Sequence, residues 1–329
     1  MPRPTAHGPT TVLHGALLID KPSGPTSHDI VAFVRRALKT PRVGHTGTLD
    51  PLATGLLVLL IGHATRLSQF LVTDEKEYLA DVRLGQSTET YDAQGLGSNR
   101  GQTGVGLGSD PGLTPDRLAA VLAEFRGTFM QTPPPFSAKK VDGVRAYKKA
   151  RKHEPVALAP VEVTVRELEV LDDLGTKDTG TKDKGTRDQG LLRLRIVCTS
   201  GFYVRSLAHD IGQRLGCGAH LEALRRTRVG RFQVADAATL DALEAAGTAA
   251  QGRLIPLNTL LADLPAVTLT DEGARRASNG NAVGPGHLAG GVPEPAIPSK
   301  VRLLDPSGTL LALAEARADG LLHPLIVLR

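Results

Sequence analysis

Residues 44–57 read GHTGTLDPLATGLL, and they place one carboxylate, Asp50, on a glycine-rich turn directly ahead of an apolar run. The glycines at the first and fourth positions permit backbone conformations that a β-carbon forbids, and Pro51 fixes φ directly after Asp50. Residues 56–61 are all aliphatic and predict a buried strand that anchors the loop. A loop held this stiffly can aim a side chain, so Asp50 is a candidate catalytic group. An ordinary Asp-Pro turn is the alternative for that dipeptide on its own.

The bulk composition fits a two-domain globular protein. The chain has 329 residues, of which 41% are hydrophobic. Residues 1–11 carry prolines but no apolar signal core, and no later apolar run approaches the roughly 18 residues of a spanning helix. We therefore expect a flexible N-terminal tail at 1–11, a cytoplasmic location and no membrane partner. Cys198 and Cys217 form no C-x-x-C pair, and the histidines form no H-E-x-x-H motif, so no metal is expected.

The charge is modestly basic and locally concentrated. A net charge of +5 is compatible with a polyanionic partner. Seven basic residues lie close together in the sequence with one acid among them: Lys139, Lys140, Arg145, Lys148, Lys149, Arg151 and Lys152. This run reads either as a phosphate-binding segment or as a solvated helical face.

Hydrophobic periodicity places the N-terminal elements. A helix is expected to begin at Thr26 or Ser27, with Asp29 in its first turn. A short helix is expected over 64–72. Residues 77–84 alternate, which puts Tyr78 on a strand near its start.

Two stretches are predicted to be flexible insertions. Residues 94–112 contain seven glycines, and residues 173–190 repeat a polar five-residue unit. Both are too polar to offset the entropy of ordering them. The second insertion lies between strands expected at 161–170 and 191–198.

A helix with apolar positions 204, 207, 208, 211 and 215 follows the second of these strands, and it places Arg205 in its first turn. A basic residue is unfavourable beside the positive end of a helix dipole, so its presence there indicates a nearby anion, for which Asp50 would serve. The alternative is an Arg205 that faces solvent.

The chain changes character around residues 255–264, which read as a linker. Beyond it we expect a helix from 270 to 280, a hairpin over 301–316 and a last strand at 321–328, together forming a compact β-barrel. No aromatic residue follows Phe232, so this unit cannot stack on unpaired bases. If it touches RNA, it reads the backbone and the shape.

Several segments resemble, in order, the motifs of the TruB family of tRNA pseudouridine synthases. The opening stretch matches the family motif that carries the catalytic aspartate, at Asp50. Four further segments are similar to its opening motif, its tyrosine motif, its arginine motif and the segment downstream of that arginine, and a fifth to its RNA-gripping insertion: residues 15–27, 76–78, 201–207, 216–226 and 133–151. The resemblance spans most of residues 12–235 and is weaker beyond, where the chain is similar to a PUA-type RNA-binding domain.

The resemblance implies an α+β fold with two domains. A catalytic domain at 12–258 would be built on a mixed, mainly antiparallel sheet flanked by helices, with an RNA-gripping insertion at about 131–153. A PUA-like β-barrel at 259–329 would follow. The implied reaction converts uridine at position 55 in the T loop of tRNA to pseudouridine. It needs no cofactor, because it involves neither redox change nor external energy.

The resemblance also assigns roles, each with a structural alternative. Asp50 would be the catalytic carboxylate, and Arg205 would keep it ionised. Tyr78 would stack on the flipped uracil and help remove its C5 proton, unless it is only a core strand residue. Leu224 would pack against the base, with a core helix residue as the alternative. His45 would enter the RNA where the target leaves its stack, or else serve as a hydrogen bonder within its loop.

Substrate binding is assigned to basic residues as well. These are Lys21 of the opening motif and six residues of the gripping insertion, which would close over phosphates of the T arm: Lys139, Lys140, Arg145, Lys148, Lys149 and Arg151.

Two other readings remain at the level of sequence. One is an RNA-binding or tRNA-folding protein in which catalysis is secondary. The other is a guide-RNA-dependent synthase of the dyskerin type, although the gripping insertion resembles that of the stand-alone form. A monomer that needs no guide RNA is expected. Whether Asp50 attacks C1′, attacks the base or removes the 2′ proton stays open.

Overall fold

The structure is a computed structural model that describes residues 13–72, 75–95, 114–137, 139–141, 143–150, 152, 158–171, 190–290 and 299–328. The expected tail at 1–11 lies outside these ranges, as do nearly all of the two expected insertions.

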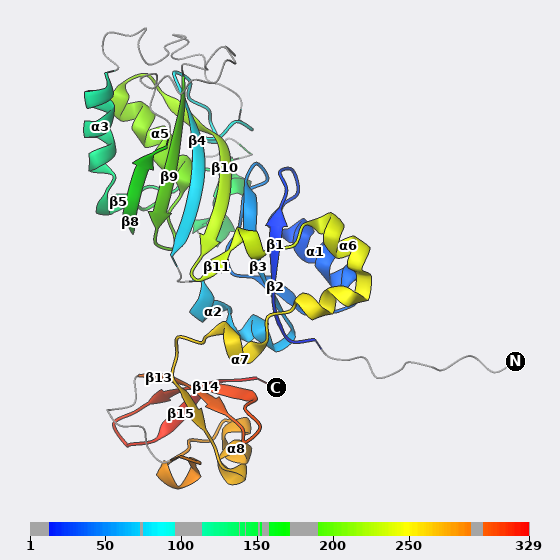
Figure 1. Ribbon diagram of the computed structural model, residues 1–329. Coiled ribbons are helices and arrows are strands. Elements are labelled where there is room, and N and C mark those ends of the chain that lie inside the picture. The colour runs from blue at the N-terminus through cyan, green and yellow to red at the C-terminus, as the bar shows by residue number, and fades with distance from the viewer. Residues whose placement is uncertain are drawn as a thin grey trace, which may run out of the picture.

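A mainly antiparallel sheet forms the body of the protein (Figure 1). Its strands follow the order β1-β3-β10-β4-β9-β8-β5, with β2 paired to β3 and β11 paired to β10. The one parallel ladder in the described sheet joins β10 to β3. The strands are β1 (Gly15–Lys21), β2 (Val43–His45), β3 (Thr54–Ile61), β4 (Lys76–Leu84), β5 (Gly127–Gln131), β8 (Val161–Val170), β9 (Leu191–Cys198), β10 (Ala219–Val229) and β11 (Phe232–Gln233).

Helices flank this sheet in two groups (Figure 1). Helices α3 (Pro115–Glu124) and α5 (Val204–Leu215) lie against the half that contains β4, β9 and β10, whereas α1 (Ser27–Ala37) and α6 (Leu240–Ala246) lie beside β1. The expected α+β class is therefore confirmed. Shorter elements complete the body: η1 (Gly62–Leu67), α2 (Ser68–Leu71), η2 (Val234–Asp236), η3 (Gly247–Arg253) and α7 (Leu257–Leu260). The expected helix at 64–72 is thus η1 followed by one turn of α2.

Strand β3 is aliphatic throughout because both of its faces are covered. Leu57, Leu59 and Ile61 belong to the main core under the helices. The alternate residues Leu56 and Val58 belong to a second cluster on the opposite face. The strand predicted directly after Asp50 is confirmed, and it fixes the end of the Asp50 loop from both sides.

The C-terminal unit is a four-stranded sheet in the order β12-β13-β14-β15 with one helix against it. Its elements are β12 (Ala266–Thr268), α8 (Asp271–Ser278), η4 (Pro285–His287), β13 (Lys300–Leu304), β14 (Leu310–Ala316) and β15 (Leu322–Val327). The Thr270 side chain caps α8, where the sequence predicts a helix start. Two isolated bridges, Leu269–Leu288 and Val283–Leu322, add backbone pairing to this small sheet.

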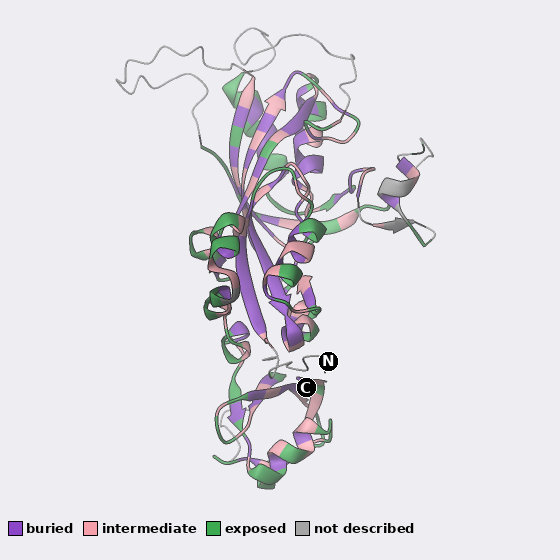
Figure 2. Ribbon diagram, turned by 90° about the vertical axis from the view of Figure 1, so that its right-hand side faces the viewer, coloured by how far each residue is buried: buried purple, intermediate pink, exposed green. Residues whose placement is uncertain are grey.

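The second cluster joins this unit to the body. Leu310, Leu313 and Leu328 pack in the same cluster as Leu56 and Val58 of β3. Figure 2 shows buried residues along the central strands and again in the lower unit. The two units therefore share apolar surface through side chains that point away from the main core.

Candidate active site

The Asp50 carboxylate is held by a bidentate ion pair with Arg205. Nε of Arg205 lies 2.9 Å from Oδ2 of Asp50, and Nη2 lies 3.2 Å from Oδ1. The Asp50 side chain is 36% exposed and that of Arg205 only 7%. The carboxylate is therefore reachable by a ligand, while the guanidinium that orients it is shielded from water. The two parallel hydrogen bonds fix the orientation of the carboxylate.

Arg205 reaches Asp50 from the first turn of α5. The backbone of Tyr203, which precedes the helix, is bonded at both its N–H (2.8 Å) and its carbonyl (3.0 Å) to the side-chain amide of Gln131. Arg205 also donates to the carbonyls of Thr90 (3.0 Å) and Phe136 (3.1 Å). Four donor contacts fix its plane, and the anion predicted beside the start of this helix is confirmed as Asp50.

A second carboxylate, Asp92, belongs to this network and was missed in the sequence. Its Oδ2 lies 3.7 Å from Nε of Arg205, and its side chain is buried. Thr90 Oγ1 donates to Asp92 Oδ1 at 2.6 Å, and the N–H of Gln94 donates to the same oxygen at 3.1 Å. The Thr-x-Asp spacing, in which one side chain can bond the other, is the signal that was available.

The Asp50 loop is tied to its surroundings by buried polar groups. Lys21 Nζ donates to the carbonyls of Ala53 (2.6 Å), Pro22 (2.9 Å) and Pro51 (3.3 Å). Lys21 is fully buried, and burial lowers the pKa of its ammonium group to about 8 against the opposing attraction of Asp50. This geometry makes Lys21 an anchor of the loop, and its role in substrate binding stays a prediction.

A cavity of about 260 Å³ opens beside Asp50. Tyr78 and Leu224 form part of its wall, on the adjacent strands β4 and β10. Tyr78 is 7% exposed, and burial raises the pKa of its phenol. The structure thus brings together Asp50, Tyr78, Arg205 and Leu224. Leu224 lies on strand β10, so the helix of the core-helix alternative is wrong, but Leu224 is buried in the main core as that alternative has it.

Arg226 is a further cavity residue that was missed in the sequence. It is 1% exposed and lies opposite Tyr78 in the β4–β10 ladder. Its Nε donates to the carbonyl of Leu56 (2.8 Å) and its Nη2 to that of Gly47 (3.0 Å). Arg226 stands among other arginines in a basic segment, so nothing in the sequence indicates that this arginine is buried.

His45 lies at the end of β2 and does not line this cavity. Its ring is half-buried, and Nδ1 has no hydrogen-bond partner in the described part of the chain. Burial is the main cause that lowers the pKa of His45, followed by the charges of Arg226 and His28. The partner-free Nδ1 atom is itself buried, and the contact of His45 with RNA stays a prediction.

The basic residues of the gripping insertion lie on a small hairpin and a helix. Lys140 is on β6 (Lys140–Val141), Arg145 on β7 (Val144–Arg145), and Lys148 and Lys149 are on α4 (Ala146–Ala150). The carbonyl of Lys139 accepts from the N–H of Ala146 at 2.7 Å. Arg151 lies outside the described residues.

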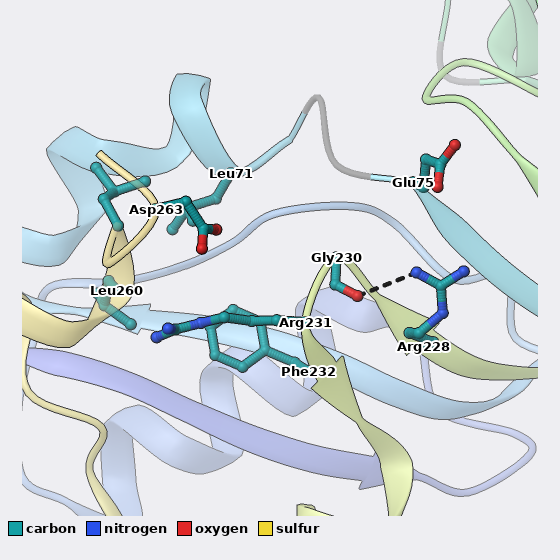
Figure 3. Close-up of a pocket in the computed structure, with 9 residues that line it drawn as sticks. Leu71, Glu75, Arg228, Gly230, Arg231, Phe232, Leu260 and Asp263 are labelled. Atoms are coloured by element: carbon teal, nitrogen blue, oxygen red, sulfur yellow. Dashed lines mark hydrogen bonds between the residues drawn. The ribbon is translucent and has the colours of Figure 1, made fainter. Parts of the chain in front are cut away.

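A second cavity, of about 290 Å³, lies between the body and the linker to the C-terminal unit (Figure 3). Arg228 and Arg231 line it with Glu75 and Asp263, and Arg228 donates to the carbonyl of Gly230 at 3.1 Å. None of the predicted site residues lines it.

Among the described residues, no three side chains of the metal-binding types gather into a cluster, and no helix is long and apolar enough to cross a membrane.

Comparison with known proteins identifies the family. Residues 35–204 match the N-terminal domain of TruB family pseudouridylate synthase, and residues 205–263 match the C-terminal domain of tRNA pseudouridylate synthase B. Two relatives named tRNA pseudouridine synthase B cover nearly the whole chain. That of Solibacter usitatus is 41% identical, over 96% of this chain and 100% of its own. That of Thermobifida fusca is 44% identical, over 95% and 98%.

Solved structures show the same fold. A Cbf5-Nop10-Gar1 complex matches with 26% identity and a TM-score of 0.66, over 97% of this chain and 86% of that one. An H/ACA RNP bound to a substrate RNA containing 2′-deoxyuridine matches with 23% identity and a TM-score of 0.64, over 96% and 85%. This protein belongs to the TruB family of pseudouridine synthases. As a pseudouridine synthase it is an isomerase.

Proposed function

We propose that this enzyme isomerises uridine to pseudouridine at position 55 in the T loop of tRNA. The observation that carries the proposal is the partly exposed Asp50 carboxylate, clamped by Arg205 at the mouth of a cavity that Tyr78 and Leu224 line. The relatives with 41% and 44% identity are named for tRNA, whereas the guide-RNP structures are only 23–26% identical. This contrast favours tRNA as substrate over the guide-dependent alternative.

The reaction breaks the bond between N1 and C1′, turns the uracil and joins C5 to C1′. Asp50 is the group that interacts with the sugar or the base, and its bidentate contact with Arg205 fixes its direction. We expect no cofactor, because the reaction involves neither redox change nor external energy.

The uridine must leave its stack before Asp50 can reach it, at a cost of a few kcal/mol. The cavity offers the extruded base the side chains of Tyr78 and Leu224. His45, from outside the cavity, fills the stacking space that the base leaves. The basic residues of the gripping insertion contact phosphates of the T arm, and binding weakens as salt rises.

The enzyme acts as a monomer in the cytoplasm and requires no guide RNA. Two assays separate this proposal from its alternatives. Purified protein alone with unmodified tRNA forms pseudouridine, which a guide-dependent synthase would not do. A tRNA-folding protein with secondary catalysis would retain its cellular effect when catalysis is removed.

The test of the site is the variant Asp50→Asn. It keeps the size and shape of the side chain but removes the charge, so single-turnover formation of pseudouridine is expected to fall by roughly 10⁴-fold or more. The dissociation constant for tRNA changes by less than about threefold, since phosphate contacts dominate affinity. Asp81→Asn is the matched control, because Asp81 pairs with Arg193 on the open face of the sheet. Wild-type rates in Asp50→Asn, or product at a uridine other than 55, would contradict the proposal.

A further inference from the structure

Arg226 is a buried charge without a counter-ion. Its side chain is among the largest of those that are fully buried, and in the part of the chain that the structure describes no carboxylate forms an ion pair with it. Its Nε and Nη2 donate to the neutral carbonyls of Leu56 and Gly47. Burying an unpaired charge costs several kcal/mol, so proteins keep one where an anion forms or binds.

The positive charge of Arg226 acts on three of its neighbours, and on two of them, Lys21 and Tyr78, the charge of Asp50 acts in the opposite direction. Burial is the main cause that lowers the pKa of Lys21 and of His45, and the Arg226 charge adds to it. In both, the Arg226 charge disfavours the protonated form. For Tyr78, burial raises the pKa overall, and the Arg226 charge opposes that effect. Tyr78 is the phenol that lies opposite Arg226 across the β4–β10 ladder, and both residues line the cavity. Tyr78 is therefore the neighbour of Arg226 that becomes an anion when it loses a proton.

The position of Arg226 is fixed by the backbone around it. Its main chain pairs with Gly55, which has φ of +97°, and a β-carbon at Gly55 would lie 2.2 Å from the carbonyl oxygen of Arg226. The strands β3, β10 and β4 thus hold Arg226 opposite Tyr78 at the wall of the cavity, with its Nη2 at the Gly47 carbonyl.

The reaction requires a base at C5. Once C1′ has joined C5, that carbon still bears its hydrogen. The C5–H bond then breaks, its electron pair forms the C5–C6 double bond, and the π electrons of the N1–C6 bond move to N1, which takes up a proton from water. The released proton goes to the Tyr78 phenolate, which had earlier lost its own proton to water, so the sequence is neutral overall.

We propose that Arg226 is a positioning residue for this step, in which its guanidinium holds the Tyr78 hydroxyl in place and stabilises the phenolate that takes the proton from C5. This inference rests on the proposed function. It adds a requirement for a positive charge beside Tyr78, which the Asp50–Arg205 pair does not supply. Asp50 then has Arg205 as its cationic partner, and Tyr78 has Arg226.

The test compares two substitutions by single-turnover kinetics with enzyme in excess. Arg226→Gln keeps a donor for the Gly47 carbonyl and removes the charge, whereas Arg226→Lys keeps the charge. At pH 7 we expect Arg226→Gln to slow pseudouridine formation at least about tenfold. We also expect its pH–rate profile to move about one unit to higher pH, because the phenolate is harder to form. Arg226→Lys keeps the wild-type profile and a faster rate than Arg226→Gln.

The pH profile distinguishes this role from a structural one. The groups that face the phenol are Arg226, Asp50 of the loop and the neutral thiol of Cys198 on β9, with Lys76, Tyr203 and Arg205 on the other cavity walls. Asp50 and Cys198 are unchanged in both variants, so a shift confined to Arg226→Gln belongs to the Arg226 charge. Equal slowing in both variants with unshifted profiles would mean that Arg226 only tethers Gly47, and would overturn the proposal. An undiminished rate in Arg226→Gln would overturn it as well.

Two controls guard the interpretation. Arg225→Gln changes the adjacent arginine, which pairs with Asp20 (2.7 Å) outside the cavity, and it leaves rate and profile unchanged. If Arg226→Gln does not fold, Arg226→Met replaces it, since apolar side chains of similar volume substitute well for buried charges. A wild-type protein that forms no pseudouridine in tRNA refutes the proposed function itself, which separates that failure from this one.

Discussion

At the scale of single residues, the site depends on cations with separate tasks. Arg205 orients Asp50, and Lys21 holds the carbonyls of the loop that follows it. The sequence predicted the first contact, because a basic residue in the first turn of a helix calls for an anion. It did not predict the burial of Lys21 or Arg226, or the part played by Asp92. Which charged side chain a fold encloses depends on which strands become neighbours, and a single sequence does not show that.

Lys21 gives the protein a pH dependence of its own. Its pKa is about 8 in the folded protein and 10.5 ordinarily. Between these values the unfolded chain binds a proton that the folded protein has released, so stability rises with pH. Relative to Lys21→Met, the wild-type free energy of unfolding should increase by about 2 kcal/mol from pH 8 to pH 10. Urea unfolding of both proteins at each pH measures this, and a difference that stays constant with pH would contradict it.

At the scale of elements, periodicity located most strands and helices of the body. The strands expected at 161–170 and 191–198 were found with those bounds, and the Thr26 cap of α1 was found as part of a capping box. Strand β10 was not recognised, although it is central to the sheet and carries Leu224 and Arg226. Its sequence, AHLEALRRTRV, is rich in leucine and arginine, which favour helices when read alone. Tertiary pairing with β4 overrides that preference.

The contact between β3 and β10 tolerates only glycine at position 55. A β-carbon there meets the Arg226 backbone, and φ of +97° is strained for any other residue. Gly55→Ala should therefore cost roughly 2–5 kcal/mol of stability, the sum of backbone strain and overpacking. Thermal unfolding measures the loss. Gly252→Ala is the control, because nothing lies within 4 Å of a β-carbon at Gly252. Equal melting temperatures for the two variants would refute this account of Gly55.

At the scale of the whole molecule, the two units are joined by a core that neither could complete alone. Helix α7 (Leu257–Leu260) lies within residues 255–264, where the sequence predicts a linker, and the domain boundary there stays a prediction. The hydrophobic pattern of the sequence did not show that one face of β3 would pack against the C-terminal unit. A strand covered on both sides has the same aliphatic sequence whichever partner covers it.

Leu313 tests this shared core. It is 1% exposed in the cluster that contains Leu56 and Val58. Leu313→Ala should lower stability by about 2–5 kcal/mol and reduce hydrogen-exchange protection on β3 as well as on β14. Leu303→Ala is the matched control, since Leu303 packs in the separate core of the C-terminal unit. Its loss of protection should remain within that unit. Unchanged protection on β3 in Leu313→Ala would show that the two units unfold independently.

The guanidinium of Arg205 connects the Asp50 carboxylate to the segment that precedes the β6–β7 hairpin. Its Nη2 nitrogen serves both Asp50 and the carbonyl of Phe136, and Phe136 leads directly into the hairpin of β6 and β7. A displacement of the Phe136 carbonyl would therefore act on the same nitrogen that orients the Asp50 carboxylate. The direction of the carboxylate is in this way coupled to the backbone ahead of β6.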